Sequence, residues 1–173
     1  MTATGTVAQI SDFATNTAFS AWALANDFLI ILIPLAILLL FAWYAGSGPF
    51  VSLLLSLYAA YAIYVVFPYM SFFPTEPPIT AFATHAGLYA VLAFVFYLIL
   101  RRIVVSDFLY IGGFGLIILA FLGAAFLIAV ASQIFLVSSF YQFTPEIAVL
   151  FASKQYFFWW FSAPAIGLLF LAR

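Results

Sequence analysis

The sequence of 173 residues has few charged residues and no cysteine. Only 5% of its residues are Asp, Glu, Lys or Arg, whereas a soluble domain carries about 25%. Because a domain of this size cannot hide so much apolar surface from water, a soluble globular protein is excluded. The lack of cysteine excludes disulfides and thiolate metal sites. A net charge of −1 offers no basic surface for phosphates, so no nucleic acid partner is expected.

Apolar and aromatic residues are abundant, at 69% and 21% of the chain. A helix needs ~20 apolar residues to cross a bilayer core of roughly 30 Å. Runs of this kind, bounded by charge, proline or glycine, predict an all-α fold class: a polytopic integral membrane protein, with a bundle of five transmembrane helices or alternatively four. The expected spans cover about residues 28–44, 50–67, 79–100, 108–135 and 156–172 of a single transmembrane domain, residues 27–173.

Helix-start motifs set several of these boundaries. Asn26-Asp27 is expected to cap the first span and Ser106-Asp107 the fourth. Thr144-Pro145-Glu146 combines a hydroxyl cap with a proline at the first helical position. We favour a short helix there, outside the membrane core, and then a fifth span from near Gln155. One continuous helix, or a hairpin that dips into the membrane and returns, are the other interpretations.

The basic residues predict the orientation. Residues 1–26 contain no Lys or Arg and are expected to form an interfacial helix or a flexible segment outside the cell. Arg101 and Arg102 lie in a short loop, which should face the cytoplasm. The C-terminus is then cytoplasmic as well. The same arginines are expected to contact anionic lipid headgroups, so the lipid bilayer is the expected partner.

Two polar residues inside the expected spans are candidate functional residues. His85 is expected to be a neutral imidazole bonded to a tyrosine, threonine or carbonyl, with a proton relay or ligand site as the alternative. Gln133, beside Ser132, is expected to bond to a neighbouring helix or to reach water. A single histidine cannot supply a metal site, and no cofactor is expected. Because the charges lie at span ends, no catalytic pair is expected in the bilayer and the protein is not expected to be an enzyme.

Small residues are expected to let the second and fourth spans pack closely as the centre of the bundle. Whether this packing occurs within one chain or between copies stays open. The candidate helix-packing residues are Ser52, Ser56, Ala60, Gly112, Gly115, Ala120, Gly123 and Ala124.

The order of these features resembles one family of membrane proteins. Five features support this resemblance. They are a glycine-bearing turn after the first span, the motifs Val51-Ser52-Leu53-Leu54-Leu55-Ser56-Leu57 and Val66-Phe67-Pro68-Tyr69, the basic pair Arg101-Arg102, and Ser106-Asp107 followed by Gly112-Gly113-Phe114-Gly115. Residues 28–138 thereby resemble the colicin V production protein family. The turn Gly46-Ser47-Gly48-Pro49 lacks the charges usual in that family, and only Asp107-Phe108 stands for its Asp-Arg pair. The resemblance implies a bacterial inner-membrane protein linked to toxin production or export and to envelope maintenance.

These observations predict a non-enzymatic multi-pass membrane protein. It is expected to act through assembly, either as a homo-oligomer or with another membrane protein. The alternative is a small transporter or channel, for which His85 and Gln133 would supply the polar pathway.

Overall fold

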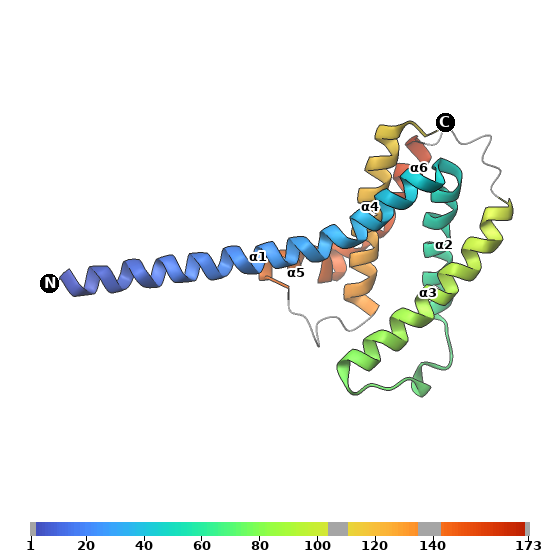
Figure 1. The fold of residues 1–173 in the computed structure, drawn as a ribbon. Coiled ribbons are helices and arrows are strands. Elements are labelled where there is room, and N and C mark those ends of the chain that lie inside the picture. The colour runs from blue at the N-terminus through green and yellow to red at the C-terminus, as the bar shows by residue number, and fades with distance from the viewer. Residues whose placement is uncertain (1–2, 104–110, 135–142, 172–173) are drawn as a thin grey trace.

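A computed structural model of the chain describes residues 3–103, 111–134 and 143–171 and is all-helical over these ranges (Figure 1). Its elements are α1 (Ala3–Ala45), α2 (Ser47–Val65), the 3-10 turn η1 (Met70–Phe72), α3 (Pro78–Ile103), α4 (Gly113–Ile134), α5 (Pro145–Ala152) and α6 (Lys154–Leu171). The all-α class predicted from the sequence is confirmed for these ranges.

Four helices are long and apolar enough to cross a membrane, which supports a multi-pass membrane protein. Their apolar stretches are Ala25–Ala45, Ser47–Val65, Pro78–Ile103 and Gly113–Ile134. The helix α6 has 18 residues but is not among them. It opens on Lys154, Gln155 and Tyr156, whose polarity lowers its mean hydropathy.

The first helix is much longer than the first expected span. It has 43 residues and is therefore about 64 Å long. Its N-terminal part projects from the bundle (Figure 1). The expected helix start at Asn26-Asp27 is wrong, because α1 passes through both residues. Between Gly5 and Pro34 no glycine or proline interrupts the sequence, and adding a residue to a formed helix is easy compared with starting one.

Two other helix boundaries differ from expectation. The second helix begins at Ser47, because Gly46 makes the sharp turn from α1 with a φ of +83° and Pro49 falls in the first helical turn. The fourth helix begins at Gly113, so the expected span is not helical at Ile111 and Gly112, and its first residues, 108–110, lie outside the described residues. The expected cap Ser106-Asp107 lies outside the described residues.

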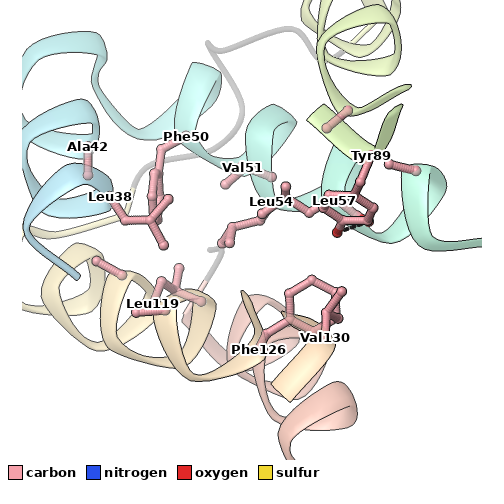
Figure 2. Packing of buried hydrophobic residues seen from close by; sticks show 14 of the residues in the cluster. Leu38, Ala42, Phe50, Val51, Leu54, Leu57, Tyr89, Leu119, Phe126 and Val130 are labelled. Carbon is pink, nitrogen blue, oxygen red and sulfur yellow. Dashed lines mark hydrogen bonds between the residues drawn. The ribbon is translucent and has the colours of Figure 1, made fainter. Parts of the chain in front are cut away.

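The second and fourth helices form the buried centre of the bundle. In their apolar stretches 50% and 56% of the residues are buried, against 11% in α1 and in α3. The third helix packs on α2, and both α1 and α6 pack on α4. Figure 2 shows one apolar cluster where side chains of α1, α2, α3 and α4 meet. Its labelled members are Leu38, Ala42, Phe50, Val51, Leu54, Leu57, Tyr89, Leu119, Phe126 and Val130.

The close packing in this cluster predicts a large effect of substitution at Gly123. A Cβ atom there would lie 2.7 Å from Cδ2 of Leu54 and 3.2 Å from Cδ1 of Leu38, and both leucines are buried. We expect Gly123→Ile to lower the free energy of unfolding by about 1–3 kcal/mol, because the added atoms overpack the core. Unfolding in mixed micelles with increasing sodium dodecyl sulfate measures this change. The control is Gly113→Ile at the start of the same helix, since a Cβ there meets nothing within 4 Å; equal stability of the two variants would contradict the packing argument.

Candidate functional site

The most unusual side chain in the structure is Asp27, whose exposed fraction is 1%. Among the charged side chains whose burial the structure describes, it is the one that is buried. Its Oδ2 accepts hydrogen bonds from the backbone N–H of Thr144 at 2.8 Å and from the Thr144 hydroxyl at 2.7 Å. These residues lie 117 positions apart in the sequence. The carboxylate therefore joins α1 to the segment that begins α5.

Asp27 caps α5, although the sequence predicts that it caps α1. The helix α5 has Thr144 as its N-cap residue and Pro145 in its first turn, as the motif predicts. Its own side-chain cap is absent, because the Thr144 hydroxyl donates to Asp27. The first amides of a helix lack helical partners and carry partial positive charge. The carboxylate satisfies one of these amides, and the positive helix end in turn offsets the free-energy cost of burying Asp27.

The opposite end of α5 is also capped by side chains. The Ser132 hydroxyl of α4 lies 2.8 Å from the carbonyl of Phe151 and is shared with the Ala129 carbonyl of its own helix, also at 2.8 Å. Nε1 of Trp160 donates to the carbonyl of Leu150 at 3.0 Å. The ring of Phe151 stacks on Trp160 with centroids 5.2 Å apart. Contacts between residues 150–151 and residue 160 mean that α5 folds back along the start of α6. The chain turns between the two helices at Ser153, which has extended backbone angles.

Beyond this turn, α6 runs antiparallel to α4. The ring of Phe161 lies 5.6 Å from that of Phe126, and the Leu171 side chain lies beside Gly115 at the start of α4. The Tyr58 hydroxyl of α2 donates to the Phe161 carbonyl, three residues before Pro164, where a proline interrupts the hydrogen bonding of α6. Pairs of small and aromatic side chains thus hold α6 against both central helices.

His85 lies in a second polar cluster, near the loop between α2 and α3. Its Nδ1 is 2.7 Å from the Tyr64 hydroxyl, and its ring lies 5.4 Å from that of Phe73. Tyr89, one helical turn further along α3, donates to the Leu57 carbonyl at 2.9 Å. Thr84 bonds to carbonyls of its own helix. The imidazole therefore contacts the Tyr64 hydroxyl and the rings of Tyr64 and Phe73, which connect α3 to α2 and to the loop that follows α2.

The remaining residues singled out from the sequence fall into distinct places. Gln133 is half-buried in the last turn of α4, and Arg101 and Arg102 are exposed in the last turn of α3. Gly112 is exposed before α4, and a Cβ there would meet nothing within 4 Å, so it makes no close helix approach in the described chain. The buried small residues are Ser52, Ser56 and Ala60 on α2, and Gly115, Ala120, Gly123 and Ala124 on α4.

The two serines of this set pack as small residues. The Ser52 hydroxyl donates to the Gly48 carbonyl at 3.1 Å, and the Ser56 hydroxyl donates to the Leu53 carbonyl at 2.6 Å. Both acceptors belong to α2 itself. Each serine therefore satisfies its hydroxyl locally and presents a small, nearly apolar surface to its surroundings.

Sequence reasoning missed the capping role of Asp27, Ser132 and Trp160. The only signal was the pairing of residue types: a carboxylate at the start of one apolar run and a helix-start motif at the start of another. Local patterns do not say which helix end receives which side chain. Within the described ranges, no three His, Cys, Asp or Glu side chains gather as metal ligands would.

The cap predicts how α5 responds to loss of the carboxylate. Asp27→Leu removes the acceptor from two partly buried donors of Thr144, so local opening of α5 should become at least about fivefold more frequent. Asp27→Asn keeps an oxygen acceptor and should have a smaller effect. Amide hydrogen exchange of residues 144–152 measures the opening, with Asn26→Leu at the exposed neighbouring position as the control. Wild-type exchange in Asp27→Leu would show that the cap does not hold α5.

Comparisons with protein-family models, with curated proteins and with solved structures give no match. The proposed function therefore rests on the fold of the chain and on the contacts between its residues.

Proposed function

We propose that this chain is a non-enzymatic multi-pass membrane protein that acts through assembly, with a second copy or with another membrane protein. The observation that carries the proposal is the one-sided packing of α3. This helix packs on α2, for example through Tyr89, and its buried residues are Ala81, Tyr89 and Ala93, whereas its opposite face is exposed. The buried polar side chains described above bond to backbone or to each other, so they serve packing and leave the outer helix faces as the surface for function.

The exposed face of α3 suits contact with another helix. Val91 and Phe94 on this face are 60% and 59% exposed. Ala83 and Gly87, on the turns before them, are exposed as well, and a Cβ at Gly87 would meet nothing within 4 Å. In lipid, apolar helices gain nothing from hiding apolar surface, so they associate where small residues let backbones approach. Ala83 and Gly87 supply small residues one turn apart on this face.

We further propose that α6 is the fifth span and that the N-terminus lies outside. The antiparallel course of α6 along α4 supports the fifth crossing. The α1–α2 turn, the end of α3 and the end of α6 lie toward one end of the bundle (Figure 1). That end carries Arg101 and Arg102, and basic residues are enriched on the cytoplasmic side. The resemblance to the colicin V production family is consistent with a bacterial inner membrane and a role in toxin production or export.

Assembly through α3 predicts cross-linking between chains in native membranes. Because the chain has no cysteine, Ala83→Cys introduces a single thiol on the exposed face of α3. We expect oxidation to give a disulfide-linked dimer, or a photo-crosslinker at the same position to capture one defined partner. Adding Gly87→Ile should reduce the product severalfold, because a bulky side chain keeps the helices apart.

The control for this experiment is Ile37→Cys on the exposed face of α1. Equal cross-linking at Ala83→Cys and Ile37→Cys would indicate random collision. A chain that stays monomeric and captures nothing at residue 83 would contradict assembly through α3.

A second candidate function, transport of a cation, is favoured by the buried carboxylate. Ionisable residues within membrane segments often mark ion pathways, and interrupted helices often form the binding sites of transporters. Asp27 lies near the start of the first apolar stretch, at the N-terminal end of the short helix α5. The same contacts also suffice for a purely structural cap.

Flux measurements separate transport from the structural role. If the chain transports a cation, proteoliposomes should take up H⁺ or Na⁺ faster than empty vesicles. Asp27→Asn should abolish that uptake and Asn26→Leu should leave it unchanged. His85→Ala tests whether the Tyr64–His85 pair belongs to the pathway. Uptake equal to that of empty vesicles would eliminate this candidate and leave assembly.

A further inference from the structure

The end of α3 contains an open cavity of about 410 Å³ that the preceding functions do not use. It is lined by two aliphatic residues, Leu98 and Ile99, and by two basic residues, Arg101 and Arg102. All four residues belong to the last turns of α3, one of the helices apolar enough to cross a membrane. The cavity therefore lies where the apolar part of the helix gives way to its charged end.

The polar lining of this cavity consists of the two guanidinium groups of Arg101 and Arg102. Both arginines are exposed, and within the part of the chain that the structure describes neither one takes part in an ion pair or a hydrogen bond. Guanidinium groups bind phosphate through paired N–H donors, with a geometry that lysine does not provide. Two adjacent arginines thus offer a site for a phosphate group at the edge of the membrane segment.

The apolar lining residues of the cavity distinguish a lipid from a free phosphate. The side chains of Leu98 and Ile99 are aliphatic and about half exposed, at 47% each. They offer contact for a glycerol backbone or an acyl chain and add nothing to the binding of a dissolved anion. Basic residues close to a membrane surface also attract anionic lipids.

We propose that this cavity binds a phospholipid with a net negative headgroup. The phosphate lies against Arg101 and Arg102, and the start of an acyl chain lies against Leu98 and Ile99. This proposal does not depend on assembly or on transport.

The test uses the full chain purified in detergent and offered a mixture of phosphatidylglycerol and phosphatidylcholine. Native mass spectrometry measures the ratio of the two lipids that stay bound. We expect phosphatidylglycerol to be preferred, and Arg101→Gln with Arg102→Gln to reduce that preference about 25-fold, or about fivefold for each arginine. The matched control is Lys154→Gln with Arg173→Gln, which removes the other two basic residues of the chain and should keep the preference.

Two further measurements keep the test decisive. Arg101→Lys with Arg102→Lys retains the charge and loses the paired donors, so its preference should be intermediate even if the glutamine variant fails to fold. An excess of inorganic phosphate should not displace the lipid. Three results would overturn the proposal. The first is the wild-type lipid preference in the lysine variant and in the glutamine variant, where the latter folds. The second is loss of that preference in the Lys154→Gln, Arg173→Gln control, and the third is displacement of the lipid by phosphate alone.

Discussion

The structure depends on one constraint: polar groups inside an apolar bundle must find their hydrogen-bond partners within the protein. In a membrane no water can satisfy them. Within the described ranges every buried side-chain nitrogen and oxygen atom has a partner. Tyr89 donates from α3 to a carbonyl of α2, and Tyr58 donates from α2 to a carbonyl of α6. These bonds, together with the packing of Leu54 against Gly123, fix which helices are neighbours.

The helix α5 shows the constraint most strongly. A helix of 8 residues is too short to be stable alone, and both of its ends carry backbone groups without helical partners. Asp27 of α1 bonds at the beginning, while Ser132 of α4 and Trp160 of α6 bond at the end. Three helices thus hold α5 in place. The buried carboxylate is explained by this role, and the same burial makes it the residue to test for transport.

The predictions made from the sequence succeed where a local property decides the outcome. The apolar runs and their lengths predict the helices, because the cost of exposing apolar side chains or unpaired backbone depends on each segment itself. Pro145 marks the start of α5 for a similarly local reason, since its missing N–H is not needed there. Asn26-Asp27 fails as a helix start because N-cap residues favour the beginning of a helix but do not interrupt a helix that already runs through them. Gly112 and Gly123 look alike in sequence, yet only Gly123 faces a neighbouring leucine.

The sequence by itself predicted a membrane environment and determined the all-α class and most of the helices of the described ranges. A chain with 5% charged residues and several long apolar runs favours helices that cross a membrane. Only the tertiary structure decided where Asp27, Ser132 and Trp160 direct their side chains. Their partners are separated by up to 117 residues, and no local pattern records such a distance. The tertiary structure also decided which faces stay exposed, because exposure depends on the neighbouring helices that a segment does or does not have.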